Sequence, residues 1–157
     1  MSLATELLVV ITLVLCGGYA GMVLMCQIGV LPAMRDVDPG SFVAAWRAMD
    51  SYMGRLMPPY KAALLVSTLV TVTVLAVQHR LRLASCFGAS FVLSIIGLVQ
   101  TVRGQLPLNA EIKVPTLPEH RIIEIREQTS AGFRVRCWLA ALSFVFLCVG
   151  VTFWPAT

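Results

Sequence analysis

The chain has 157 residues, of which 58% are hydrophobic and 13% are charged. This charged share is roughly half of that found in soluble domains, and the charges lie between long apolar runs. A water-soluble domain is therefore excluded in favour of a membrane protein. The net charge of +4 requires no nucleic-acid partner, because basic residues beside membrane spans explain it.

Four apolar runs follow one another along the chain, and none of them contains Asp, Glu, Lys, Arg or His. Each is long enough to cross a hydrocarbon core of about 30 Å as a helix. The first is a retained helix and no signal peptide, because MSLATE lacks Lys and Arg and contains Glu6. We predict one all-α domain over residues 1–157, an integral membrane four-helix bundle. Its spans are expected at about 7–31, 60–78, 83–103 and 136–154.

The connections between the spans are unequal in length. Residues 79–82, HRLR, join the second and third spans tightly, whereas 32–61 and 103–136 are long. Four spans place both long connections on one side of the membrane and both termini on the other. The long connections hold ten of the twelve Lys and Arg residues: Arg35, Arg47, Arg55, Lys61, Arg103, Lys113, Arg121, Arg126, Arg134 and Arg136. The positive-inside rule then puts them in the cytoplasm, as in a bacterial-type inner membrane.

The first long connection is expected to be an interfacial helix. Asp38 before Pro39 is typical of a helix start. A stripe follows at helical spacing: Phe42, Trp46, Met49 and Met53. This stripe should lie at the membrane interface or pack on the bundle, and the helix should end at Met57-Pro58-Pro59.

The second long connection begins with PLN at 107–109. Pro107 is expected to end the third helix, which leaves Asn109 free to bond backbone carbonyls or a ligand. Another helix should start near Glu119 and run into the fourth span. Its apolar side would carry Ile122, Ile125, Thr129 and Phe133. The sequence shows no internal repeat.

Polar and aromatic residues that could form a site all belong to one end of the bundle. They are Trp46, Asp50, Tyr52, Tyr60, Gln100, Arg103, Gln105, Asn109, Glu111, His120, Arg126, Arg134 and Arg136. The simpler interpretation is a solvated rim with snorkelling arginines and an aromatic belt. A di-iron site is disfavoured, because no carboxylate lies inside a span. The five cysteines are expected to be small buried hydrophobes.

The arrangement resembles the DUF1772, or anthrone oxygenase-like, family of small four-helix membrane proteins. The resemblance covers nearly the whole chain. It consists of a Gly-rich first helix, prolines after it and before the second span, P-x-N after the third span, and an Arg-bearing helix leading into the fourth. These are Gly17, Gly18, Gly21, Pro32, Pro58, Pro107, Asn109, Arg126 and Arg134. Either Arg134 or Arg136 matches the family position, and IREQTSAGFRVR contains no Trp.

The resemblance implies an oxidoreductase, a monooxygenase that oxidises an anthrone-like or phenol-like lipophilic aromatic with O2 as co-substrate and no dedicated cofactor. Asn109 would donate to the substrate oxyanion, Arg126 or Arg134 would supply charge, and Glu111 or His120 would take the proton. The residues expected to contact the substrate are Trp46, Tyr52, Tyr60, Arg103 and Pro107.

Two other functions stay open at this point. One is a membrane protein without enzymatic activity that binds lipid, quinone or a partner protein. The other is a metal-dependent membrane oxidase with a metal bound by loop residues. The expected surroundings are the lipid bilayer and a lipophilic aromatic small molecule, and assembly into a homo-oligomer is left open.

Overall fold

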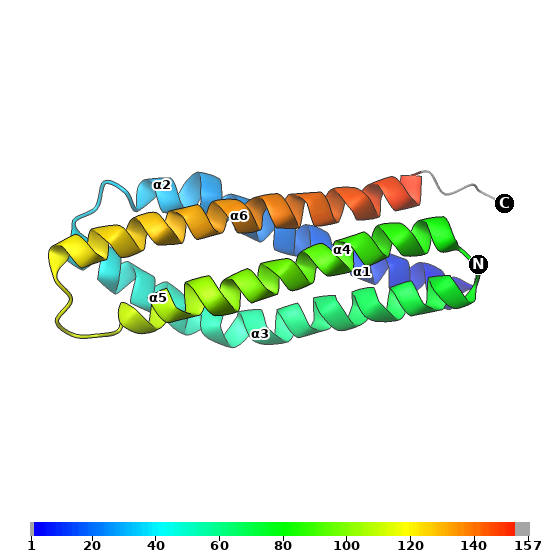
Figure 1. Cartoon of the computed structure of the whole chain (residues 1–157), viewed down its shortest axis with the longest axis horizontal. Helices are drawn as coiled ribbons and strands as arrows, with labels where there is room; N and C mark the ends of the chain where they lie inside the picture. The colour runs from blue at the N-terminus through cyan, green and yellow to red at the C-terminus, as the bar shows by residue number, and fades with distance from the viewer. Residues whose placement is uncertain (1, 153–157) are drawn as a thin grey trace.

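The computed structural model describes residues 2–152, and within them the chain is entirely helices and short connections (Figure 1). Four long helical rods form an all-α bundle, as the sequence predicts. The elements in chain order are α1 Leu3–Met25, a π-helical turn η1 Cys26–Val30, α2 Leu31–Ala33, α3 Pro39–Val77, α4 Leu81–Gln100, a second π-helical turn η2 Thr101–Gln105, α5 Leu106–Glu111 and α6 Glu119–Thr152. The predicted end of the fourth span at 154 lies outside the described residues.

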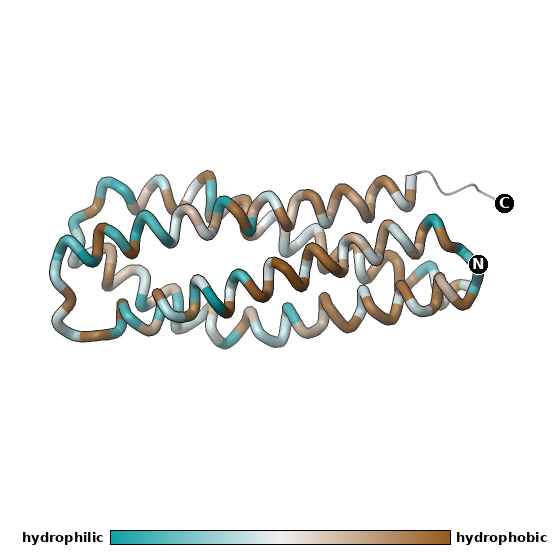
Figure 2. Tube along the Cα trace, in the orientation of Figure 1, coloured by the Kyte–Doolittle hydropathy of each residue, from teal (hydrophilic) through white to brown (hydrophobic). Residues whose placement is uncertain are grey.

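All four rods are long and apolar enough to cross a membrane. Many large apolar side chains on their outer faces are exposed, including Val10, Val14, Val66 and Trp138. Exposed apolar side chains on every rod are what a lipid-facing surface requires. Hydrophilic residues gather toward the end of the bundle that holds the connections 34–38 and 112–118 (Figure 2). The start of α1 and the 78–80 turn lie at the opposite end (Figure 1).

The long connections are mostly continuations of the spanning helices, and two predicted helix ends are wrong. Helix α3 has 39 residues and passes through Pro58 and Pro59. The residues just after the prolines are anchored to α1: the Tyr60 hydroxyl donates to the Leu15 carbonyl at 2.6 Å, and Lys61 Nζ lies 3.3 Å from the centre of the Tyr19 ring. The sequence cannot show these contacts, which hold α3 together where two backbone donors are missing.

Pro107 also fails to end its helix. In η2 the Leu106 N–H bonds to the Thr101 carbonyl, five residues back, so the helix widens just before the proline. Pro107 then lies in the first turn of α5, where a missing N–H costs little. Turn η1 uses the same arrangement, with the Leu31 N–H bonded to the Cys26 carbonyl before Pro32. A π-turn therefore lets each helix continue through its proline.

The two π-turns have similar sequences and lie at corresponding places in the order of elements. Gly29-Val30-Leu31-Pro32 and Gly104-Gln105-Leu106-Pro107 both read Gly-x-Leu-Pro and lie 75 residues apart. Each half is a helix with a π-turn, a loop and a long returning helix. The same separation relates Lys61 to Arg136. The main contacts in the bundle are between α1 and α3, α3 and α4, α4 and α6, and α6 and α1. Helices α1 and α4 are therefore diagonal to each other, and so are α3 and α6.

The interior has two apolar clusters. The larger lies among the apolar parts of the four rods and includes Val9, Leu64, Phe87 and Leu147. The smaller lies at the connection end and consists of Leu31, Phe42, Trp46, Ile112, Ile122 and Ile125. The predicted apolar faces of the two connections supply most of this second cluster, which confirms that they pack on the bundle. Asp38 also caps α3 as predicted, accepting a bond from the Ser41 N–H at 2.9 Å.

Candidate functional site

A group of polar side chains adjoins both apolar clusters. We call it the polar layer and define it by Tyr19, Asp50, Lys61, Gln100, Gln105, Asn109, Lys113 and Arg136. All four rods contribute to it, and Gln105 and Arg136 are buried. Buried polar groups are costly unless they bond to one another or to a ligand, so their connections decide what the layer can do.

Asn109 is the centre of a hydrogen-bond chain. Its Oδ1 accepts from Trp46 Nε1 at 3.1 Å and from Gln105 Nε2 at 2.9 Å, while its Nδ2 donates to Asp50 Oδ1 at 2.6 Å. The other Asp50 oxygen pairs with Lys113 Nζ at 2.7 Å. The Asn109 amide therefore bonds to protein groups. To donate to a substrate oxyanion, as predicted, its Nδ2 would have to give up or share the hydrogen bond to Asp50.

Arg136 continues the chain into the bundle. Its Nη2 donates to Gln105 Oε1 at 3.0 Å, and its guanidinium lies 3.9 Å from the centre of the Phe133 ring. The residue is 8% exposed, and its buried Nε has no hydrogen-bond partner within residues 2–152. Arg134 is exposed. The structure thus places Arg136, and not Arg134, inside the bundle.

Lys61 and Arg136 line the same internal cavity. Its remaining lining residues carry hydroxyl, thiol and apolar groups and include no carboxylate: Cys16, Tyr19, Leu93, Ser94, Gly97, Leu139, Ala140 and Ser143. The cavity volume is about 10 Å³, room for about one water-sized group. Serines continue from it into the apolar interior, with Ser143 Oγ at 2.6 Å from Ser90 Oγ. The cavity is therefore small, has mostly apolar walls and is flanked by two cationic side chains.

Several predicted site residues lie apart from the polar layer and have other contacts. Glu111 forms an ion pair with Arg121, which also bonds Glu124 at 2.7 Å. His120 is exposed at the start of α6. Neither predicted base reaches the buried arginine through any contact in the described part of the chain.

The other predicted residues divide between structural contacts and the outer surface. Arg126 donates to the Arg35 carbonyl at 2.7 Å and the Val37 carbonyl at 3.1 Å, so it holds the 34–38 connection. Tyr52 is 76% exposed. Pro107 is exposed as well. Trp46 is buried beside Asn109, stacked on Phe42 and edge-on to Phe133. Of the predicted substrate contacts, Trp46 is the one bonded into the layer.

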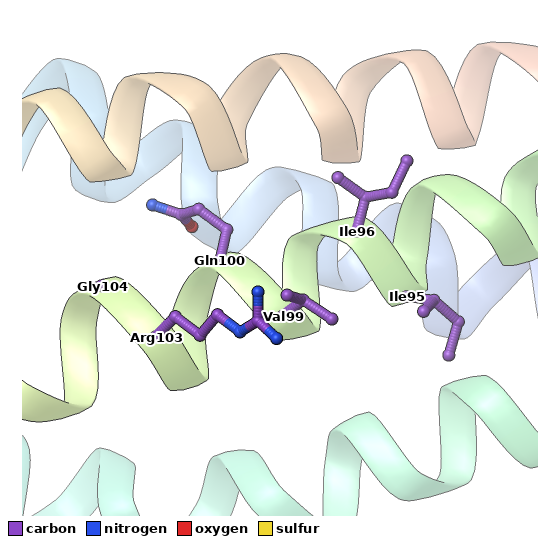
Figure 3. A pocket seen from close by; sticks show the side chains of 6 residues that line it. All are labelled: Ile95, Ile96, Val99, Gln100, Arg103 and Gly104. Carbon is purple, nitrogen blue, oxygen red and sulfur yellow. The ribbon is translucent and has the colours of Figure 1, made fainter.

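An open groove of about 460 Å³ runs along the outer face of α4 and η2. Its floor is Ile95, Ile96 and Val99, and Gln100, Arg103 and Gly104 lie toward one end (Figure 3). Gln100 and Arg103 share this face, as their spacing predicts. Gln100 Nε2 also donates to the Gly132 carbonyl at 3.2 Å on α6. The groove therefore adjoins the polar layer at the α4–α6 contact.

Three residues of the layer were missed as site candidates from the sequence. Lys61 and Lys113 were counted only as basic residues of the connections, and Tyr19 lies within the first apolar run. One signal in the sequence could have pointed to Lys61. It precedes Arg136 by 75 residues, the same number that separates the two Gly-x-Leu-Pro segments. Tyr19 carries no comparable signal.

Fold and site together define a small four-helix membrane protein with a buried cationic polar layer. No protein-family model, no curated protein and no solved structure matches the chain. Within residues 2–152, no three His, Cys, Asp or Glu side chains are grouped as metal ligands.

Proposed function

We propose that this protein is a membrane oxidoreductase that oxidises a lipophilic anthrone-like or phenol-like aromatic with O2 at the polar layer. One observation carries the proposal: Lys61 and Arg136 line one internal cavity that contains no carboxylate. Two cations in a water-poor site stabilise a negative charge that develops on a bound molecule. The resemblance to anthrone oxygenases supports the choice of reaction.

The chemistry follows from the acidity of an anthrone. Lys61 in its amine form takes one proton of the central CH2, and the resulting anion is stabilised by the new ammonium and by Arg136. The anion passes one electron to O2, and the radical and superoxide combine into a carbon-bound peroxide. The ammonium returns its proton to the peroxide. The second C–H proton then leaves with hydroxide as water, so anthrone and O2 give anthraquinone and water.

This proposal changes the roles expected from the sequence. Arg136 takes the place of Arg126 and Arg134 as the positive group, and Lys61 takes the place of Glu111 and His120 as the base. Asn109 becomes a positioning residue, because it holds Gln105, which in turn bonds Arg136.

The substrate would arrive from the lipid through the α4 groove. Its rings are too large for a cavity of about 10 Å³, so the cavity has to widen until the central CH2 of the substrate reaches Lys61. Gly97 has no side chain at the α4–α6 contact between the groove and the cavity. A Cβ atom added at Gly97 would lie 3.9 Å from Leu139 Cδ1. We propose that a movement of Leu139 widens the cavity toward the groove.

The test is oxygen uptake by the purified protein in detergent with a simple anthrone. We expect uptake above the spontaneous rate in the wild type and a loss of more than about tenfold in Arg136→Gln. Arg134→Gln is the matched control, because it makes the same chemical change on an exposed residue of the same helix. Wild-type uptake equal to the spontaneous rate would remove anthrones as substrates. Equal activity in the two variants would remove Arg136 from the reaction.

A second candidate function is binding of a lipid or quinone without turnover, which the open apolar groove with Gln100 and Arg103 at one end favours. It predicts binding that Ile96→Trp weakens, with no oxygen uptake. A metal-dependent oxidase would instead lose its oxygen uptake when the protein is treated with chelator.

We also propose that the connection end faces the cytoplasm, because ten of the twelve Lys and Arg residues lie in the two long connections. A single cysteine placed at Thr116 in a cysteine-free variant tests this. It should react with a membrane-impermeant maleimide only after the inner membrane of the cell is opened.

A further inference from the structure

We propose that the cavity between Lys61 and Arg136 is a binding site for one small monovalent inorganic anion such as chloride. The anion occupies the site in the resting protein and competes with the substrate anion. The competition rests on the proposed function, whereas the binding of the anion does not.

Lys61 lacks an acceptor for its charge within the part of the chain that the structure describes. Its Nζ lies over the Tyr19 ring, 3.3 Å from the ring centre, and makes no ion pair or hydrogen bond to any residue in the 2–152 range. An ammonium group has three N–H donors, and the face of one ring satisfies them only in part. A partly buried ammonium without an acceptor therefore needs a counter-ion.

Arg136 faces the same cavity as Lys61. Gln105 accepts from its Nη2, but its buried Nε lacks a partner among the described residues. The hydrogen-bond chain from Arg136 ends at Asp50, and that carboxylate is already paired with Lys113. The polar layer thus contains three cations and one carboxylate, so the cavity lies in a region of net positive charge.

The size and chemistry of the cavity fit a small anion. Its volume of about 10 Å³ suits one water-sized group or small ion and excludes a ring system. The lining includes hydroxyl groups from Tyr19 and Ser94, whereas the Ser143 hydroxyl donates to the Ser90 carbonyl at 3.1 Å. Hydroxyls can donate to an anion while the two side-chain cations balance its charge. No side chain in the lining would repel it.

All four rods also form the cavity. Lys61 and Arg136 come from the diagonal helices α3 and α6, and Tyr19 and Ser94 come from the diagonal helices α1 and α4. The site is complete only when both hairpins pack together, so anion binding should stabilise the bundle.

The experiment measures binding of radiolabelled chloride to the full-length protein in detergent, in gluconate buffer, with bromide as competitor. We expect saturable binding of one chloride per chain, together with a higher unfolding temperature in chloride than in gluconate. Lys61→Met should weaken the binding more than about tenfold. Arg55→Met is the matched control, because it removes an exposed cation of the same helix outside the polar layer, and it should leave the affinity unchanged.

The outcomes separate this inference from the proposed function. Absence of saturable chloride binding, or equal affinity in the wild type and Lys61→Met, overturns the anion site even if anthrones are oxidised. Chloride binding lost in Lys61→Met supports the site even if no anthrone is oxidised. If both occur, chloride should raise the KM for the anthrone and leave kcat unchanged. Arg136→Gln gives a second test where it folds, with the same loss of chloride affinity expected.

Discussion

Replacing Asn109 with leucine tests whether the polar layer acts as one connected unit. The substitution keeps the side-chain size and removes both the acceptor and the donor of the amide. Trp46 Nε1 and Gln105 Nε2 lose their acceptor, and Asp50 loses one donor. Trp46 and Gln105 are 3% and 4% exposed, so water cannot replace the lost acceptor without a rearrangement.

The expected cost follows from these three contacts. Each buried neutral donor left without a partner costs about 1–3 kcal/mol. Asp50 keeps its ion pair with Lys113. Losing the hydrogen bond from Asn109 to Asp50 therefore adds only about 1 kcal/mol. The free energy of unfolding should therefore fall by about 3–7 kcal/mol, a large part of the roughly 5–15 kcal/mol typical of a domain. Gln128→Leu, the same kind of change on an exposed residue of α6, should cost less than about 0.5 kcal/mol.

The assay is unfolding of the purified protein in mixed micelles by increasing SDS, followed by far-ultraviolet circular dichroism. A double-mutant cycle sharpens it: Trp46→Phe removes the indole donor, so Trp46→Phe/Asn109→Leu should cost about 1–2 kcal/mol less than the two single variants added together. If Asn109→Leu costs less than about 1 kcal/mol, or the two changes add without coupling, the polar layer does not act as one connected unit.

Three further predictions concern local contacts. Gly18→Ala should destabilise the bundle by about 1–3 kcal/mol, because an added Cβ would lie 2.7 Å from the Tyr60 Oη; in the Tyr60→Phe background the same SDS titration should show a smaller loss. His79→Gly should raise stability by about 0.4–1 kcal/mol, because His79 has φ 57° at the end of α3; no gain would mean that the turn does not restrain this residue. Hydrogen bonds from Ser41 lower the pKa of Asp38 below the ordinary value of 3.8. The Asp38 cap therefore stabilises the fold above about pH 4, and this stability is lost as the pH falls through the lower pKa of the folded state. The difference in unfolding free energy between the wild type and Asp38→Ala should shrink on acidification. A difference that stays constant with pH would contradict this.

The sequence determined those features that depend on neighbouring residues. The four spans follow from uninterrupted apolar runs of sufficient length, and the start of α3 follows from the ability of Asp38 to accept from nearby N–H groups. The apolar sides of both connections also follow from spacing alone, because residues three and four apart share a helix face. These interactions act over a few residues and are little changed by the rest of the fold.

Helix ends at prolines were predicted wrongly because tertiary contacts and π-turns decide them. Pro58 and Pro59 lack backbone donors, yet α3 continues because Tyr60 is fixed to α1. Pro107 lies inside a continuous helical rod because the preceding π-turn supplies a five-residue hydrogen bond.

The site required the tertiary structure most of all. Arg134 and Arg136 lie about 200° apart around α6, so their spacing shows that they face opposite ways. Only the positions of the other three rods show that Arg136 faces inward. Lys61 and Tyr19 become site residues for the same reason: the cavity joins side chains that are far apart in the sequence. Such contacts depend on how whole helices pack, which no short segment of the sequence specifies.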